Sequence, residues 1–268
     1  MKLDIYNTEK QKVSSTDLPI QFNEEFRPDL IKRAVHALQS AARQDYGANP
    51  DAGMRHSSTL SKRRRKYRGC YGFGISRVNR KIHSRRGTRM FWVGTFSPQT
   101  VGGRRAHAPK SEKILEKFIN KKENRKAIRS AMAATLNKNV VQERGHLIPE
   151  EYPFIIDGSF ETLSKTKDIK QALLKLGFAE EIERSLLKKV RAGIGKMRGR
   201  KYRRKKSLLI VVNETCPLSK AAKNIPGIDI TVVKALNAEI LAPGTMSGRV
   251  TLWTTKAIDT INNDNLFI

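Results

Sequence analysis

The chain has 268 residues, with 53 lysines and arginines against 25 aspartates and glutamates, and a formal net charge of +28. This excess of positive charge makes nucleic acid the first partner to consider, and the 38% hydrophobic content suffices for one large or two small domains. Two distant cysteines indicate neither a disulfide framework nor a metal knuckle. Because the start lacks the apolar core of a secretory signal and no apolar run approaches a membrane span, we expect a reduced, cytoplasmic protein without membrane partners.

Two elements are predicted near the N-terminus. A weak alternation of apolar and polar residues predicts a strand or a hairpin within residues 1–20. Residues 26–43 predict a helix, because Pro28 suits its first turn and apolar side chains between residues 30 and 38 recur at helical spacing. His36 lies off this apolar stripe, so we interpret it as an ordinary polar-face residue and not as a catalytic one.

Residues 43–110 form a basic stretch without a periodic apolar pattern. The stretch has 17 lysines and arginines against two aspartates, and it holds 9 of the 18 glycines and 7 of the 18 aromatic residues. It is far longer than an ordinary connection and its charge is self-repulsive, so we expect it to order only against a polyanion. Arginine forks, aromatic faces and glycines together suit RNA recognition, and we interpret the stretch as an extended loop that penetrates RNA.

Residues 111–137 predict a long helix after this loop. Ser111 fits the N-cap position, and Ile114 and Phe118 begin an apolar face that continues through residues 128–136. Two helices would then bracket the basic loop and hold its two ends.

The C-terminal half alternates between predicted strands and helices. Strands are expected at 152–157, 207–213, 228–233 and 250–254, and helices at 166–176, 180–191, 218–223, 235–240 and 256–261. Residues 207–213 are apolar and β-branched, as a strand buried on both faces requires. The pattern predicts an α/β fold with a parallel, Rossmann-like sheet and flanking helices. This domain comprises residues 1–42 and 111–268, and the extended basic loop 43–110 is inserted between two helices.

No motif for a cofactor or a catalytic centre emerges. Glycine clusters at 69–74 and 193–199 lack the G-x-G-x-x-G spacing and its strand-to-helix context, and the sequence contains no P-loop motif. Asp157 follows a predicted strand, but no partner base is evident and we favour a turn-capping role. The cysteine and histidines of the basic loop lack metal-ligand spacing, so we interpret them as nucleic-acid contacts. We therefore predict no cofactor, no metal and no enzymatic activity.

A second basic element lies at residues 196–206, where eight of eleven residues are lysine or arginine and none is acidic. The two basic elements carry +15 and +8, which is +23 of the net +28. Such a run is often a solvated face or a localisation signal. Its position directly before a buried strand favours contact with phosphates.

Five blocks, spread in order over the whole chain, resemble one protein family. They are FRPDLIKRAV at 26–35, GGRRAHAPKSEKI at 102–114, RAGIGKMRGRKYRRKK at 191–206, LLIVV at 208–212 and LAPGTMSGRVTLW at 241–253. The blocks resemble large-subunit ribosomal protein four, the universal L-four family, in its archaeal form.

The resemblance implies a structural constituent of the large ribosomal subunit. Members of the family bind large-subunit rRNA near its 5′ end, early in assembly, and their extended loop helps to line the nascent-polypeptide exit tunnel. The implied partners are this rRNA, neighbouring large-subunit proteins and the nascent polypeptide, with no small-molecule substrate.

The resemblance also implies which residues bind rRNA. Residues 102–107 and 191–206 match the family's blocks, whereas for residues 63–89 the assignment rests on place and composition. The residues that we predict to bind rRNA are Arg55, Lys62, Arg63, Arg64, Arg65, Lys66, Arg68, Arg77, Arg80, Lys81, Arg85, Arg86, Arg89, Arg104, Arg105, His107, Arg191, Lys196, Arg198, Arg200, Lys201, Arg203, Arg204, Lys205 and Lys206. The candidate tunnel-facing tip comprises Tyr67, Gly69, Cys70, Tyr71, Gly72, Phe73, Gly74 and His83.

Two other function classes stay open at this point. An RNA-processing or RNA-modifying enzyme on a similar scaffold would need a cofactor loop or an acid–base cluster after a strand, and neither is evident. A DNA-compacting or chromatin protein would prefer duplex DNA to folded large-subunit rRNA at matched salt.

Overall fold

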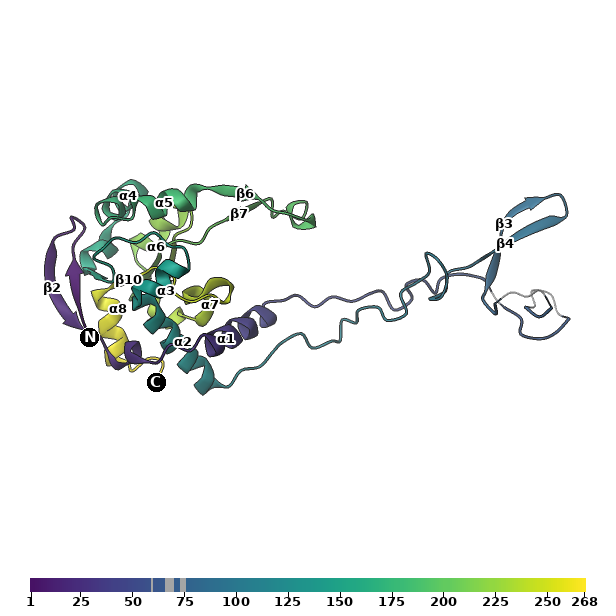
Figure 1. Ribbon diagram of the computed structural model, residues 1–268, viewed down its shortest axis with the longest axis horizontal. Coiled ribbons are helices and arrows are strands. Elements are labelled where there is room, and N and C mark those ends of the chain that lie inside the picture. The colour runs from purple at the N-terminus through teal and green to yellow at the C-terminus, as the bar shows by residue number, and fades with distance from the viewer. Residues whose placement is uncertain (59, 66–69, 73–75) are drawn as a thin grey trace. The chain divides into compact units, whose positions relative to one another are not determined.

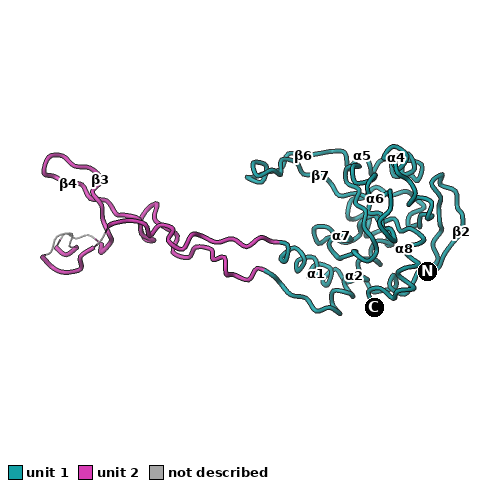
Figure 2. Tube along the Cα trace, turned by 180° about the vertical axis from the view of Figure 1, so that it is seen from behind, with its two compact units in different colours: residues 1–42, 116–268 teal, residues 43–115 magenta. Residues whose placement is uncertain are grey.

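The computed structural model describes every residue except 59, 66–69 and 73–75 (Figure 1). The chain divides into two compact units (Figure 2). Unit 1 comprises Met1–Ala42 and Glu116–Ile268, and unit 2 comprises Arg43–Leu115. Among the described residues, no helix is both long enough and apolar enough to cross a membrane.

Unit 1 is built on a six-stranded sheet in the order β2-β1-β5-β10-β8-β9. Its strands are β1 (Lys2–Tyr6), β2 (Lys12–Asp17), β5 (Ile155–Ile156), β8 (Leu209–Val212), β9 (Asp229–Val232) and β10 (Thr251–Thr254). All neighbouring strands are parallel except β1 and β2, which form an antiparallel hairpin at one edge. The predicted parallel α/β fold and the N-terminal hairpin are both confirmed.

Helices cover both faces of the sheet (Figure 1). One face packs against α1 (Pro28–Ala41), α2 (Lys121–Leu136), α7 (Ala238–Leu241) and α8 (Thr255–Asn263). The other face packs against α3 (Lys138–Glu143), α4 (Thr166–Lys175), α5 (Ala179–Leu186) and α6 (Pro217–Ala221). The predicted helices 26–43, 166–176, 218–223 and 256–261 are therefore present, with ends that differ by a few residues.

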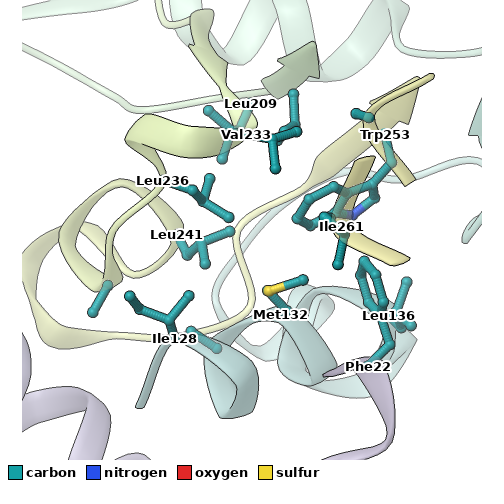
Figure 3. Close-up of a cluster of buried hydrophobic side chains, with 14 of the residues drawn as sticks. Phe22, Ile128, Met132, Leu136, Leu209, Val233, Leu236, Leu241, Trp253 and Ile261 are labelled. Carbon is teal, nitrogen blue, oxygen red and sulfur yellow. The ribbon is translucent and has the colours of Figure 1, made fainter. Parts of the chain in front are cut away.

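The central strands contribute side chains to both cores because successive residues of a strand point to opposite faces. Leu209 belongs to the core under α2, and Ile210 belongs to the core on the other face. Figure 3 shows the first core, where the rings of Trp253 and Phe22 pack edge to face with centroids 4.9 Å apart. Burial on both faces explains why β8 has an unbroken apolar sequence.

Two predicted helix boundaries are wrong. The helix expected from residue 111 begins only at Lys121, and Ile114 and Phe118 are 80% and 78% exposed. Helical turns without a buried face are marginal in water, so the apolar spacing of these side chains is not sufficient. The helix expected at 180–191 ends at Leu186, because the next residues pair as β6 (Lys188–Val190) with β7 (Tyr202–Arg204).

Candidate nucleic-acid interface

A β-hairpin projects from unit 2 (Figure 1), where the sequence indicated no regular structure. It consists of β3 (Arg80–Arg86) and β4 (Arg89–Gly94), joined by a two-residue turn. The turn begins with Gly87 at a φ of 59°, a conformation that glycine adopts without steric cost. The strand β4 is apolar on both faces, so no alternation marks it in the sequence.

This hairpin exposes aromatic side chains among arginines. Phe91 and Trp92 are 41% and 43% exposed, and the guanidinium of Arg89 lies 5.1 Å from the ring centroid of Phe91. Elsewhere in unit 2, the Arg77 guanidinium lies 5.1 Å from the ring centroid of Tyr71. Aromatic faces and arginine planes are the groups on which unpaired bases stack. Sequence reasoning did not single out Phe91 and Trp92, although an aromatic pair inside an arginine-rich run was a visible signal.

The two ends of the basic loop run side by side within unit 2. The backbone N–H of Ala48 donates to the carbonyl of Pro109 at 2.9 Å, and a groove of about 1050 Å³ lies along this pairing. Arg104, Arg105 and His107, which were all predicted to contact rRNA, line the groove together.

Most of the second basic element, residues 196–204, lies in a hairpin that begins at Lys188, and we call this hairpin the basic arm (residues 188–204). In its register Lys188 lies opposite Arg204 and Lys189 lies opposite Arg203. Like charges that face each other across a strand pair are destabilising. The arm therefore has a charge arrangement that a polyanion would stabilise. The sequence identified its charge but not its strands.

Shortly before the arm in sequence, the buried carboxylate of Glu181 binds groups from two separate segments of the chain. Glu181 is fully buried and accepts hydrogen bonds from Arg184 Nη2 (2.6 Å), His146 Nδ1 (2.8 Å) and the backbone N–H of Leu147 (3.0 Å). Burial opposes ionisation of Glu181, but the bonds from Arg184 and His146 outweigh it and lower its pKa to about 2. Burial lowers the pKa of His146, so the imidazole is neutral and its Nδ1–H donates to the carboxylate.

A buried arginine holds the chain where it leaves the arm and re-enters the sheet. Arg249 is 1% exposed, and its guanidinium donates to Asp229 Oδ2 (2.6 Å) and to the carbonyls of Ser207 (2.8 Å) and Ile240 (3.0 Å). Asp229 also accepts from Lys206 Nζ at 2.8 Å. Burial lowers the pKa of Arg249. Burial alone would raise the pKa of Asp229, but Lys206 and Arg249 outweigh this effect and lower it. Sequence reasoning missed Arg249 because its partners are distant in sequence.

Residues of both networks line a cavity of about 670 Å³ at the foot of the arm. Eight of its lining residues are lysine or arginine, and none of the described lining residues is acidic. Four of these cations, Arg144, Arg184, Lys188 and Lys189, lie outside residues 43–110 and 196–206 and were not predicted as contacts.

The structure places most of the predicted rRNA-binding residues on the surface. Of those that it describes, Arg80, Arg104 and Arg191 are half-buried and all others are exposed. Among the tip candidates, Tyr71, Gly72 and His83 are exposed, whereas Cys70 is buried. Lys66, Tyr67, Arg68, Gly69, Phe73 and Gly74 lie outside the described residues.

The groups considered for catalysis and metal binding have structural surroundings. Asp157 caps a short helical turn, and its Oδ2 accepts from the backbone N–H of Ser159 at 3.2 Å, in the role that the sequence favoured. Cys70 and Cys216 are free thiols. Across the described part of the chain, no group of three or more histidine, cysteine, aspartate or glutamate side chains is arranged to hold a metal ion.

Comparison with known proteins gives a consistent result over the whole chain. The model of the ribosomal protein L4/L1 family matches residues 16–264. The chain is 50% identical over 268 residues to the large ribosomal subunit protein uL4 of Nanoarchaeum equitans, with 100% of both chains covered. It is 44% identical to the proteins of the same name from Archaeoglobus fulgidus and Methanocaldococcus jannaschii, over 97% of each chain. The chain therefore belongs to the ribosomal protein L4/L1 family.

Proposed function

We propose that this protein binds large-subunit rRNA through the basic loop 43–110 and the basic arm. Its family makes it a structural constituent of the large ribosomal subunit in the cytoplasm and not an enzyme. On this proposal, unit 1 acts as the folded scaffold, and the basic loop and the arm reach into RNA.

The single observation that carries the proposal is the unbalanced charge of these two elements. Of the described residues that we predict to bind rRNA, only Arg55 and Lys206 form an ion pair with a carboxylate, Asp51 and Asp229 respectively. The other described cations have no such partner among the residues that the structure describes. Phosphates of RNA supply the missing charge, and release of their counterions supplies free energy.

The exposed aromatic residues of the hairpin β3–β4 support RNA as the polyanion. Phe91 and Trp92 present apolar rings to solvent beside arginines, and unpaired RNA bases can stack on them. Duplex DNA has its bases stacked inside the helix, so contact with the rings would first require unstacking a base step at a cost of a few kcal/mol. The same feature disfavours a DNA-compacting role.

We further propose that the protein binds near the 5′ end of the large rRNA early in subunit assembly, as its family resemblance implies. The basic loop would then be flexible before assembly, because ordering each residue costs about 1–2 kcal/mol and RNA contacts provide the compensation. The loop tip around residues 67–89 would help to line the exit tunnel and meet the nascent polypeptide. Neighbouring large-subunit proteins would contact unit 1.

Two charge-matched variants of the full-length protein test the rRNA contact. The first variant has glutamine in place of Arg85, Arg86 and Arg89 of the hairpin. The second has glutamine in place of Lys165, Lys167 and Lys170, which are exposed at α4. Binding to in vitro transcribed large-subunit rRNA is measured from 50 to 400 mM salt. We expect the first variant to reduce the slope of log K against log salt by about 0.7–0.9 per lost contact, and the second to leave it unchanged. Equal slopes for the two variants would contradict the proposal.

A deletion of residues 57–100 tests the loop inside the assembled subunit. After a high-salt wash of cell lysate, the intact protein should sediment with the large subunit, because a loop threaded through RNA is retained when exposed phosphate contacts are screened. The deletion variant should still bind but be stripped at lower salt. An intact protein that washes off freely would reopen the enzyme and DNA-binding alternatives.

A further inference from the structure

The cavity at the foot of the basic arm is built from four separated segments of unit 1. They are the end of α3, the stretch from α5 into β6, the stretch from β7 to the start of β8, and the turn after α7. Its volume of about 670 Å³ falls within the range of about 300–1000 Å³ that is typical of ligand sites. The folded domain therefore brings cations together that no single sequence run contains.

Arg144 is a half-buried cation of this cavity that no carboxylate of the described residues neutralises. Its side chain donates to the carbonyls of Pro243 (2.8 Å) and Met246. Burial and the nearby positive charges of Arg249 and Arg184 lower its pKa to about 10, so it stays protonated at neutral pH. A fixed cation that is partly desolvated and repelled by its neighbours is stabilised by a bound anion.

The cations around Arg144 are held in place unequally. Arg184 is fixed by its two bonds to the Glu181 carboxylate, and Lys206 is fixed by Asp229. The other six lysines and arginines that line the cavity have no carboxylate partner among the described residues. Two cations of the cavity are therefore held in place by carboxylates, and the other six carry positive charge that no described carboxylate balances.

We propose that this cavity is a preformed site for the phosphodiester backbone of folded RNA, with Arg144 as its central phosphate contact. This inference rests on the proposed function and extends it to residues outside the basic stretches.

The surroundings of the cavity favour a polymer over a free nucleotide. The positive charge continues from the cavity along the arm through Arg191, Arg198 and Arg200, as a chain of phosphates requires. Among the described lining residues, no phenylalanine, tyrosine or tryptophan is present to stack on a nucleotide base. Recognition here is therefore of the backbone and not of a base.

The test compares Arg144→Gln with Lys170→Gln, a charge-matched change on exposed α4, in the full-length protein. Binding to in vitro transcribed large-subunit rRNA is measured at about 150 mM salt, after circular dichroism has shown that both variants melt like the wild type. We expect Arg144→Gln to weaken binding about tenfold, the loss typical of one charge-assisted hydrogen bond, and Lys170→Gln to have no effect. A double variant, Lys188→Gln with Lys189→Gln, lies in the exposed arm and provides a second measurement if Arg144→Gln alters the melting.

The outcomes separate this inference from the proposed function. If the wild type binds rRNA but the cavity variants weaken binding less than about threefold relative to Lys170→Gln, the cavity is not an RNA site. If the wild type itself shows no preference for rRNA over duplex DNA, the proposed function is wrong as well. Calorimetric titration with inorganic phosphate tests the alternative that the cavity binds a free phosphate anion and not a phosphate of RNA. Saturable binding that Arg144→Gln abolishes, without a change in rRNA affinity, would assign the cavity to a free anion and overturn the proposal.

Discussion

The buried Arg249 offers the most direct test of how the arm is attached to the domain. Replacing it with methionine keeps a long flexible side chain but removes the guanidinium that joins Asp229 to the carbonyls of Ser207, Ile240 and Leu208. The carbonyls of Ser207 and Ile240 would then lose this donor, whereas the Leu208 carbonyl keeps the backbone N–H of Asp229 at 3.0 Å.

The expected loss follows from these contacts. Removing one member of a buried ion pair costs about 3–5 kcal/mol, because the remaining polar groups stay desolvated. The Asp229 side chain is 35% exposed and keeps its ion pair with Lys206 Nζ at 2.8 Å, and methionine recovers part of the packing. We therefore expect a loss at the lower end of this range, about 3 kcal/mol. Against a typical free energy of unfolding of about 5–15 kcal/mol, this is a large fraction.

Urea unfolding of the full-length protein followed by tryptophan fluorescence provides the assay. The chain has two tryptophans, so a Trp92→Phe background leaves the buried Trp253 as the reporter. The control is Arg33→Met, which breaks the surface pair with Glu123 (3.2 Å) and should cost less than about 1 kcal/mol. If Arg249→Met destabilises the protein no more than Arg33→Met, the reasoning about the buried clamp is refuted.

Three further changes probe other parts of unit 1. Glu181 has a native pKa of about 2 against an ordinary value of 4.5, so its ionisation stabilises the fold above about pH 4.5 and this contribution is lost as pH falls toward 2. Glu181→Gln should therefore flatten the decline of the unfolding free energy over this range, and an unchanged curve would count against the buried network. Gly227→Ala should destabilise by about 2–3 kcal/mol in urea, because φ is 83° and a Cβ would lie 2.7 Å from Ser185 Cβ; a neutral effect would show that this turn can relax. Tyr152→Phe removes a buried hydroxyl that accepts from the Thr251 N–H at 3.3 Å, with an expected loss of about 1–3 kcal/mol, and equal stability would mean that the hydroxyl is dispensable.

Local sequence patterns were sufficient for most of the fold. The unbroken apolar run of β8 correctly indicated a strand buried on both faces, and the apolar spacing of α1 correctly indicated a helix. Both patterns report directly on burial, because a residue's face is set by a period of two or of about 3.6. The concentration of charge in residues 43–110 and 196–206 was likewise visible in the sequence alone.

The same patterns failed where burial did not follow local spacing. Ile114 and Phe118 have helical spacing, but they find no core to pack against and the helix starts later. The strand β4 has apolar residues on both exposed faces, so its pairing with β3 leaves no alternation. In both places tertiary packing, or its absence, overrides the local preference.

The sequence by itself therefore determined the fold class, the family and the location of the charge. Only the tertiary structure decided the sheet order, the carboxylate network of Glu181, the Arg249 clamp and the cation cavity. The residues of these networks are far apart along the chain. Glu181 and His146 are separated by 35 positions, and Arg249 and Ser207 are separated by 42. Such contacts depend on how distant segments pack, and a local periodicity carries no information about them.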